Sequence, residues 1–358
     1  MTAVVDGYEL GGFSSTRGIG RYLDNVLGRL PRPGLEVTLL ASNGVQPPPG
    51  VRAATLRRWA PSRFAGAEHE LRIGWDLART PGDVLFAAGL TAPVATRRPV
   101  VQTIFDTTPL RFAVGSPSAI AAWRRNARRA RRAAAVIAIS QASADDAVSQ
   151  LGVPAARIHV VHLGVSSIFA PGARPAVATT PTLLFVGEYG AHKGHREAFA
   201  VVAGLAARGV PHTLRVASRL APWHRPIVEA LVTRSGAAER VELLDYVPDI
   251  VEEYRGAEAL IVTSRNEGFC LPALEAMACG TPVVAFANSA LPEVVGDAGV
   301  LVPDGDVPAM IDALVGLLAD RERRAELAAA GVERARQFTW DACADAHAEI
   351  LLAAAATG

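Results

Sequence analysis

The chain has 358 residues, which is enough for two domains of ordinary size, each with its own hydrophobic core. Half of the residues are apolar, but they are spread along the chain, so no run approaches the ~20 apolar residues needed to span a bilayer. The formal net charge of +1 argues against a general nucleic-acid-binding protein.

The first residues enter a predicted strand directly, without the basic and apolar leader of a signal peptide. The three cysteines, Cys270, Cys279 and Cys343, show no metal-ligand spacing and cannot all pair with one another. These features indicate a protein of the reducing cytoplasm.

In the first half of the chain, short β-branched runs alternate with helical patterns, which favours parallel sheets covered by helices on both faces. Strands are predicted at residues 3–5, 35–40, 84–86, 100–104, 135–139 and 158–161. Helices are predicted at residues 18–30, 118–132 and 142–151.

Residues 170–180 are rich in Pro and small residues, as a domain linker should be, and the alternating pattern restarts after them. Strands are predicted at residues 182–186, 213–217, 241–243, 259–262, 283–286 and 299–301. The last predicted helix covers residues 340–355, with Thr339 as its N-cap and Asp341 in its first turn.

Two carboxylates bracket a loop within residues 265–284, at Glu267 and Glu275. Pro272 is expected at the first helical position, so that the unpaired amides of this helix face back toward the preceding loop and Glu275 falls in the first turn. A helix N-terminus favours a phosphate, whereas two carboxylates favour hydroxyl groups. A nucleotide sugar, which has phosphates in its middle and polyols at both ends, fits both.

This Glu-x7-Glu pattern, followed by Ala-Met-Ala-x-Gly-x-Pro-Val-Val, resembles the signature of glycosyltransferase group 1, family four, which comprises retaining enzymes. Further segments resemble other landmarks of the family, in family order, at residues 16–22, 139–143, 162–165, 185–194 and 291–299. The resemblance implies the α/β GT-B fold, in which two Rossmann-like doubly wound domains face each other across a cleft.

The resemblance also implies a division of the chain. The expected parts are an N-terminal acceptor-binding Rossmann-like domain at 1–169, a linker at 170–180, a C-terminal nucleotide-sugar-binding Rossmann-like domain at 181–337, and a C-terminal helix within 338–358 that crosses back to the first domain.

In the family, the two signature carboxylates bind hydroxyl groups of the donor. By resemblance, Glu267 reaches hydroxyls of the transferred sugar and Glu275 accepts hydrogen bonds from the ribose. The loop between them completes the expected donor site with Gly268, Phe269, Cys270 and Leu271. The alternative is that Glu275 merely caps its helix, since acidic residues are common in first turns.

Glycines and basic residues are expected around the diphosphate. Gly18 and Gly20 precede a helix and permit close backbone approach to an anion, with Arg17 as an extra cation. Gly187 ends a strand and leads to Lys193, the candidate for neutralising the diphosphate charge. The alternatives are an ordinary turn at the glycines and a solvated surface lysine.

The chain departs from the family pattern at two places. Glu188 and His192 stand where many members have basic residues, so Lys193 could be the sole cation of the site unless Arg219 reaches in. Phe105-Asp106 stands where many members have His-Asp, which leaves Asp106 as the candidate for a catalytic role in sugar or acceptor binding.

Three further patterns have ordinary explanations that we favour. Asp306 suits an N-cap better than a metal ligand, and His192 with His195 lacks a third ligand at metal-binding spacing. The six arginines within 121–132 could dock on an anionic membrane, but they also suit a solvated helix face. No metal site is expected.

The implied reaction transfers a hexosyl group from a nucleotide sugar, with GDP-mannose as the suggested donor, to a hydroxyl of a small-molecule, lipid-linked or polysaccharide acceptor. The catalytic candidates are Glu267, Lys193 and Asp106, and no cofactor is expected beyond the nucleotide sugar as co-substrate. Two alternatives remain open: a sugar-nucleotide epimerase of the same fold, and a degenerate protein that only binds nucleotide sugars.

Overall fold

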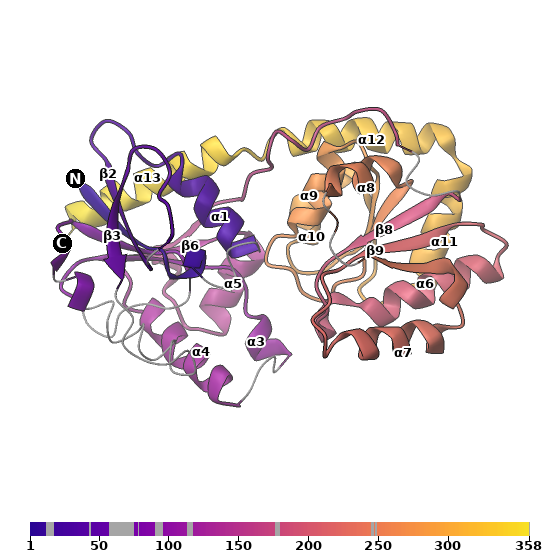
Figure 1. The fold of residues 1–358 in the computed structure, drawn as a ribbon, viewed down its shortest axis with the longest axis horizontal. Helices are drawn as coiled ribbons and strands as arrows, with labels where there is room; N and C mark the ends of the chain where they lie inside the picture. Colours follow the sequence, from indigo (N-terminus) through magenta and orange to yellow (C-terminus); the bar gives the residue numbers. More distant parts are fainter. Residues whose placement is uncertain are drawn as a thin grey trace. The chain divides into compact units, whose positions relative to one another are not determined.

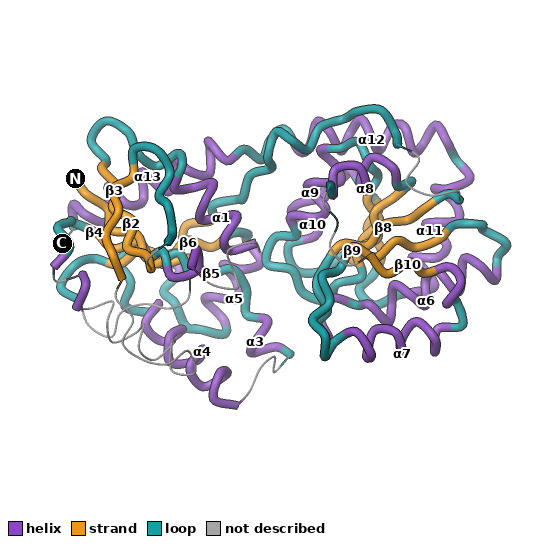
Figure 2. The backbone as a smooth tube through the Cα atoms, viewed as in Figure 1, coloured by secondary structure: helices purple, strands orange, loops and turns teal. Residues whose placement is uncertain are grey.

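The computed structural model describes residues 1–11, 18–42, 44–56, 75–77, 79–89, 96–112, 117–175, 180–244, 247 and 249–357. The chain divides into two compact units, one formed by Met1–Gly164 with Thr339–Gly358 and the other by Val165–Phe338. Each unit contains one sheet with helices packed beside it (Figures 1 and 2). Among the described residues, no helix has both the length and the apolar character needed to cross a membrane.

The first unit is built on a seven-stranded sheet in which every described strand pair is parallel. Its strand order is β3-β2-β1-β4-β5-β6-β7. The strands are β1 (Thr2–Asp6), β2 (Glu36–Ser42), β3 (Val51–Leu56), β4 (Val84–Ala87), β5 (Val100–Ile104), β6 (Ala135–Ala138) and β7 (Ile158–Val160). The helices are α1 (Gly18–Leu27), α3 (Thr108–Arg111), α4 (Pro117–Ala130), α5 (Gln141–Ser149) and α13 (Trp340–Ala356).

The C-terminal helix α13 belongs to this first unit and packs on α1 and on strands β4, β5 and β6 (Figure 1). Tyr22 of α1 is fully buried, and its hydroxyl oxygen lies 2.5 Å from Nε2 of His347 in α13 and 2.9 Å from Oγ1 of Thr103 in β5. Nδ1 of His347 lies 2.7 Å from the carbonyl oxygen of Cys343. This buried chain of polar contacts joins the two helices and the sheet.

The second unit is built on a six-stranded parallel sheet in the order β10-β9-β8-β11-β12-β13. The strands are β8 (Thr182–Val186), β9 (Thr213–Ala217), β10 (Val241–Leu244), β11 (Ala259–Val262), β12 (Val283–Phe286) and β13 (Val300–Val302). The helices are α6 (His195–Ala207), α7 (Arg225–Ser235), α8 (Ile250–Gly256), α9 (Leu271–Ala278), α10 (Leu291–Val295), α11 (Val307–Ala319) and α12 (Arg321–Ala335).

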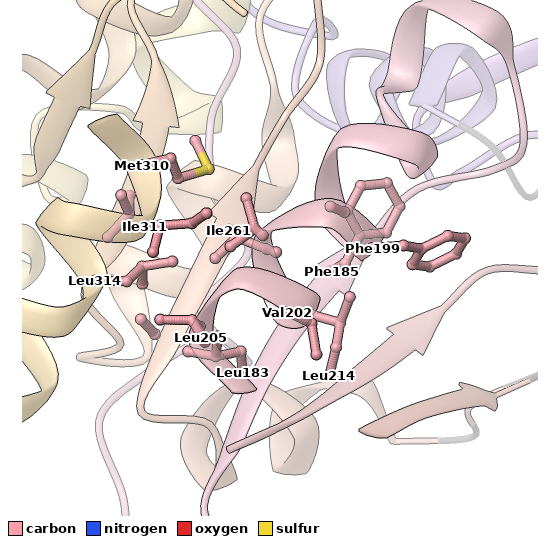
Figure 3. Close-up of a cluster of buried hydrophobic side chains, with 14 of the residues drawn as sticks. Leu183, Phe185, Phe199, Val202, Leu205, Leu214, Ile261, Met310, Ile311 and Leu314 are labelled. Atoms are coloured by element: carbon pink, nitrogen blue, oxygen red, sulfur yellow. The ribbon is translucent and has the colours of Figure 1, made fainter. Parts of the chain in front are cut away.

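The core of the second unit lies between the sheet and the helices α6 and α11 (Figure 3). Strands such as β11 are buried on both faces, which explains why they read as continuous apolar runs rather than alternating ones. The core includes Phe185, Phe199, Leu205, Leu214, Ile261, Met310 and Leu314.

The structure confirms every strand predicted from the sequence, to within two residues at the ends. It also confirms two helix caps, since Oγ1 of Thr339 accepts from the amide of Ala342 and Oδ1 of Asp306 accepts from the amide of Ala309. The edge strand β3 was not predicted. The helix predicted at residues 18–30 is shorter in the structure, where α1 ends at Leu27.

The two units divide after Gly164 and after Phe338, whereas the predicted linker spans 170–180. Residues 176–179 of that segment lie outside the described residues. Its beginning packs on the second unit, because Nε and Nη2 of Arg255 donate to the carbonyl oxygen of Ala170 at 2.9 and 2.8 Å.

Candidate active site

The strand order of the second sheet reverses at β8, which lies between β9 and β11. Connections from adjacent strands therefore leave toward opposite faces of the sheet beyond the carboxyl ends of β8 and β11. Open α/β sheets bind ligands at such a point. The two loops that follow these strands carry the candidate residues Lys193 and Glu267.

Lys193 and Glu267 form a two-pronged ion pair. Nζ of Lys193 donates to both carboxylate oxygens of Glu267, at 2.8 and 2.9 Å. The lysine side chain is 25% exposed and the glutamate side chain 11% exposed, so the pair is largely shielded from water. Lys193 is also the only lysine in a chain that has 36 basic residues of Lys or Arg type. The possibility that it is a solvated surface lysine is therefore not supported.

The loop that carries Lys193 is attached to the end of β11. Gly194 has φ of +72°, and a Cβ atom at this position would lie 2.0 Å from the carbonyl oxygen of Thr263. Oγ1 of Thr263 donates to the Gly194 carbonyl at 2.8 Å, and the amide of Arg265 donates to the His192 carbonyl at 2.7 Å. Only glycine permits this close approach, which brings Lys193 to the Glu267 loop.

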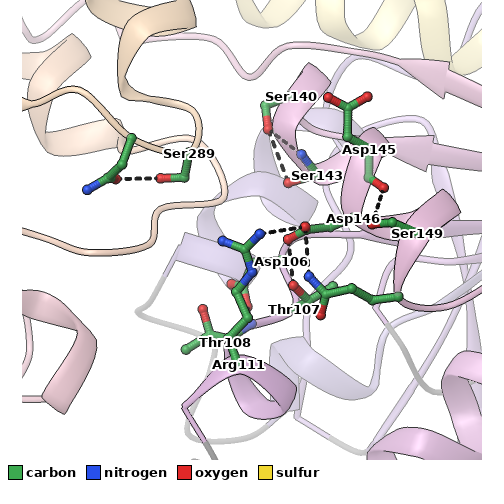
Figure 4. A network of polar contacts seen from close by, with 12 residues as sticks. Asp106, Thr107, Thr108, Arg111, Ser140, Ser143, Asp145, Asp146, Ser149 and Ser289 are labelled. Carbon is green, nitrogen blue, oxygen red and sulfur yellow. Dashed lines mark hydrogen bonds and ion pairs between the residues drawn. The ribbon is translucent and has the colours of Figure 1, made fainter. Parts of the chain in front are cut away.

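The Glu267 loop is held from its other side by the loop after β12. The amide of Glu267 donates to Oγ of Ser289 at 2.9 Å, and Nδ2 of Asn288 donates to the carbonyl of Ser264 at 2.9 Å. Oγ of Ser289 in turn donates to Oδ1 of Asn288 (Figure 4). Three consecutive strand-end loops thus fix the backbone of Glu267.

The loop from Gly268 to Cys270 leads directly into α9. The helix begins at Leu271, one residue before the predicted start at Pro272. Cys270 is its N-cap, with φ of +77° and no side-chain cap hydrogen bond, and it is buried. Burial, followed by the charge of Glu267, raises the pKa of the Cys270 thiol, so this cysteine is a neutral, unreactive group.

Phe269 is buried and packs edge-on against Phe338, with ring centroids 5.7 Å apart. Its side chain therefore contributes to packing within the second unit. The start of α9 offers a ligand the positive end of the helix dipole rather than a row of amides. Pro272 has no N–H group, and the amide of Ala273 already donates to the Cys270 carbonyl at 3.1 Å.

Glu275 does not lie in the first turn of α9, as the sequence predicted, because it is the fifth helical residue. It does not cap the helix either. Its side chain is 3% exposed, and Oε2 accepts a hydrogen bond of 2.9 Å from the hydroxyl of Tyr254 in α8. The carboxylate thus receives a hydrogen bond from a neighbouring helix.

His195, two residues after Lys193, is enclosed by aromatic rings. His195 is the first residue of α6 and packs against Phe185, Tyr189 and Phe199, with ring centroids 4.6, 5.3 and 6.2 Å apart. Burial, then the charges of Lys193 and His192, lowers the pKa of His195 to about 4. It is therefore neutral near pH 7 and supplies no charge to the site.

Gly187 lies at the other end of the lysine loop. Its amide donates to the carbonyl oxygen of Ala217 at 3.2 Å, and a Cβ atom there would lie 3.8 Å from Cδ of Lys193. The lysine stem thus passes close to Gly187.

Within the described residues, no three His, Cys, Asp or Glu side chains are grouped as a metal site.

In the first unit, Asp106 follows β5 in a loop that is anchored by α5 (Figure 4). Oδ1 of Asp106 accepts from the amide of Thr108 at 2.7 Å. Asp146 of α5 receives hydrogen bonds from Oγ1 of Thr107 at 2.5 Å and from Nη2 of Arg111 at 2.9 Å. On the other side of Asp106, Oγ of Ser143 donates to the carbonyl oxygen of Phe105 at 2.7 Å, so the loop is held both before and after this residue.

Phe105, which replaces a histidine of the family pattern, packs edge-on against Tyr22 with ring centroids 5.1 Å apart.

Gly18 and Gly20 lie within the first turn of α1 rather than before the helix, and a Cβ atom at Gly18 would have no neighbour within 4 Å. Arg17 lies outside the described residues. Trp123, on the arginine-rich helix α4, packs against the core of its unit.

Two family models match the chain, one in each half. The model described as Glycosyltransferase Family 4 matches residues 16–167, and the model described as Glycosyl transferases group 1 matches residues 180–320. The chain belongs to the glycosyltransferases of group 1, family four. The residues that the second model matches include Lys193, Glu267, Glu275 and helix α9.

Relatives of this glycosyltransferase include the O-antigen chain mannosyltransferase B of Escherichia coli, which is 32% identical over 221 residues. That match covers 58% of this chain and 58% of the relative. The D-inositol 3-phosphate glycosyltransferase of Xylanimonas cellulosilytica is 36% identical over 239 residues, which cover 60% of this chain and 56% of the relative. The chain thus matches little more than half the length of each relative.

Solved structures share the fold over the whole chain. Sucrose-phosphate synthase from Thermosynechococcus elongatus has a TM-score of 0.81 at 20% identity and covers 100% of both chains. Anabaena HepE in complex with UDP and glucose has a TM-score of 0.76 at 21% identity and covers 99% of this chain and 100% of its own. The glycosyltransferase therefore has the GT-B fold that the resemblance implied.

Proposed function

We propose that the protein transfers a hexosyl group from a nucleotide sugar to an acceptor hydroxyl, with retention of the anomeric configuration. The observation that carries the proposal is the Lys193–Glu267 pair. Lys193 lies on the loop after β8, and Glu267 lies on the loop after β11, which leads into α9. Together the two loops supply a cation for a diphosphate, a carboxylate for sugar hydroxyls and a helix N-terminus.

Each candidate has a separate task in this proposal. Lys193 and the positive end of the α9 dipole stabilise the negative charge that develops on the leaving diphosphate. Glu267 accepts hydrogen bonds from hydroxyls of the transferred sugar, and Glu275 accepts them from the ribose. Asp106, in the first unit, binds the acceptor or the sugar.

Retention through two displacements would require a carboxylate nucleophile at the anomeric carbon. Glu267 and Glu275 are engaged by Lys193 and Tyr254, so we assign neither to that role. Instead, the acceptor oxygen attacks from the side on which the diphosphate departs. The bond from the anomeric carbon to the acceptor oxygen forms, the bond to the diphosphate oxygen breaks, and that oxygen takes the acceptor proton. No metal ion or cofactor takes part in this proposed sequence.

The donor class is proposed from the relatives. The mannosyltransferase among them supports mannose as the transferred sugar, and GDP-mannose is the donor that the family resemblance suggests. The UDP complex of HepE makes a UDP-linked hexose the first donor to compare with it. The acceptor is proposed to be a hydroxyl of a small molecule, a lipid-linked sugar or a polysaccharide.

The lone lysine makes a direct binding test possible. With trace amounts of an acetylating reagent, only Lys193 and the N-terminal amine can form stable amides in this chain. A bound nucleotide sugar should slow acetylation of Lys193 and leave the N-terminal amine, an internal control, unchanged. Mass spectrometry of the two peptides measures both. If no GDP-, UDP- or dTDP-sugar protects Lys193 at millimolar concentration, the proposal is wrong.

Turnover distinguishes the alternatives. Release of a nucleoside diphosphate only when an acceptor is present supports transfer, whereas formation of a sugar epimer without acceptor supports an isomerase. Protection of Lys193 without turnover on any acceptor supports a protein that only binds nucleotide sugars.

A further inference from the structure

Tyr254 contacts the α9 segment at two places. Its hydroxyl donates to Oε2 of Glu275 at 2.9 Å, and its carbonyl oxygen accepts from Oγ1 of Thr281 at 2.6 Å. Thr281 follows the end of α9, so one residue of α8 holds both a side chain within α9 and the chain beyond it. Tyr254 is fully buried, and Glu275 is 3% exposed.

Helix α8 is itself fixed to the sheet. Glu253, the residue before Tyr254, accepts from Nε and Nη2 of Arg215 at 2.7 and 2.9 Å. Arg215 belongs to β9, and both side chains are about 10% exposed. Because a bidentate pair of this kind allows little rotation, the Tyr254 hydroxyl is presented to Glu275 from a rigid support.

Glu275 needs such a partner because of where it lies. A carboxylate that is 3% exposed is costly to bury unless it accepts hydrogen bonds, and the Tyr254 hydroxyl supplies one of them. A charged group that loses a buried hydrogen bond is strongly destabilised, so the carboxylate keeps the orientation in which it meets the Tyr254 hydroxyl.

We propose that Tyr254 is a positioning residue for nucleotide recognition, which holds the Glu275 carboxylate in the orientation that binds the ribose diol. This inference rests on the proposed function, in which Glu275 accepts hydrogen bonds from the ribose. Tyr254 acts through Glu275 and does not itself touch the nucleotide.

The test compares a nucleoside diphosphate with its 2′,3′-dideoxy analogue, for the base that protects Lys193 best. The ratio of the two dissociation constants, measured by calorimetry, reports the contribution of the ribose hydroxyls. For the wild-type protein we expect a ratio of about ten or more, since hydrogen bonds to a charged group are involved. For Tyr254→Phe we expect this ratio to fall about fivefold.

The chain offers a matched control in Tyr22→Phe. Tyr22 is also fully buried and also uses its hydroxyl in a hydrogen bond, but it belongs to the other unit. Both variants should unfold at lower urea concentration than the wild-type protein. Only Tyr254→Phe should change the ratio of the two dissociation constants.

The outcomes separate the inference from the function on which it rests. If the wild-type protein binds neither nucleotide, the proposed function fails and the inference fails with it. If the wild-type protein discriminates between the two nucleotides and Tyr254→Phe discriminates equally well, Tyr254 has only a structural role and the inference alone fails.

A second variant covers the case in which Tyr254→Phe does not fold. Incorporation of 4-aminophenylalanine at position 254 keeps the ring and replaces the hydroxyl with a weaker hydrogen-bond donor. The weaker hydrogen bond to Oε2 of Glu275 should lower the ratio, and an unchanged ratio would overturn the inference.

Discussion

Lys193 and Glu267 are 74 residues apart in the chain, yet Nζ of the lysine lies 2.8 and 2.9 Å from the two carboxylate oxygens of the glutamate. The two residues assigned to opposite parts of the donor therefore neutralise each other before any ligand arrives. Binding of a diphosphate has to redistribute this pairing, which makes the two residues energetically coupled.

Glu267→Gln should change binding and catalysis in opposite directions. Removal of the carboxylate leaves Lys193 without its counter-charge, so a nucleoside diphosphate without sugar should bind several-fold more tightly, by about 1 kcal/mol. Transfer should slow by roughly a hundredfold, because a hydrogen bond to the reacting sugar is weakened. Calorimetry and initial rates measure the two effects.

The control for this variant is Glu197→Gln, which removes a carboxylate from the first turn of α6 that pairs with the exposed Arg196. It should leave both quantities unchanged. Weaker binding of the nucleoside diphosphate to Glu267→Gln would contradict the idea that the carboxylate competes for Lys193.

Lys193→Arg should behave like a loss of the side chain rather than like a conservative change. The chain uses arginine for every other basic position, so the one lysine marks a site where a compact ammonium is needed. A planar guanidinium would form its own fork with Glu267 and turn away from a phosphate. We expect at least a tenfold loss of affinity for the nucleoside diphosphate, measured by calorimetry.

Arg196→Lys is the matched control for Lys193→Arg, because Arg196 is an exposed neighbour in the same segment of the chain. Its affinity should equal that of the wild-type protein. Wild-type affinity in Lys193→Arg would show that any positive charge suffices at this position.

Gly194→Ala should destabilise the protein strongly, while Gly236→Ala should have a small effect. Both glycines have positive φ, +72° and +75°, so an alanine at either position costs about 1 kcal/mol of backbone strain. At Gly194 the new methyl group would also collide with the Thr263 carbonyl, for a total of about 3 kcal/mol. At Gly236 nothing lies within 4 Å. Urea denaturation of the two variants measures the difference, and equal losses would contradict the close packing of the lysine loop.

Stability of the first unit should fall in acid because of His347. Burial lowers the pKa of His347 to about 4, although the Cys343 carbonyl opposes this effect. The folded state therefore favours the neutral ring. The contribution of this preference to the free energy of unfolding is complete above pH 6.5, the approximate pKa of histidine in the unfolded chain. It is lost as the pH falls toward 4, by up to about 3 kcal/mol.

His347→Gln provides the comparison for this pH dependence. The variant should be less stable than the wild-type protein near pH 7, and the difference should narrow as the pH falls from 6.5 to 4. Hydrogen exchange of the α13 amides, corrected for intrinsic rates, reports the first unit specifically. A difference that is constant with pH would exclude titration of His347 as the cause.

Much of the architecture could be predicted because its signals are local. Buried parallel strands such as β11 are short apolar runs, and Thr339 and Asp306 lie where a polar side chain can cap the helix that follows. The strand β3 could not be predicted in the same way. It lies at the edge of the sheet and carries an exposed Arg52, so it lacks the pattern of a buried strand.

The sequence predicted individual candidate residues of the site, but it did not predict the contacts between them. Glu267 and Lys193 were identified from motifs, whereas their pairing depends on three strand-end loops that meet only in the folded sheet. The partner of Glu275 was missed for a similar reason. Tyr254 lies on a different helix, and nothing in its immediate sequence distinguishes it from a core tyrosine.

The position of α13 determines the order in which the two units can be completed during synthesis. The helix supplies His347, which contacts Tyr22 and packs against Phe86 with ring centroids 5.5 Å apart. All of Val165–Phe338 must therefore leave the ribosome before the first unit acquires its last helix. The second unit can fold in that interval, while the nascent first unit still exposes apolar surface that chaperones recognise.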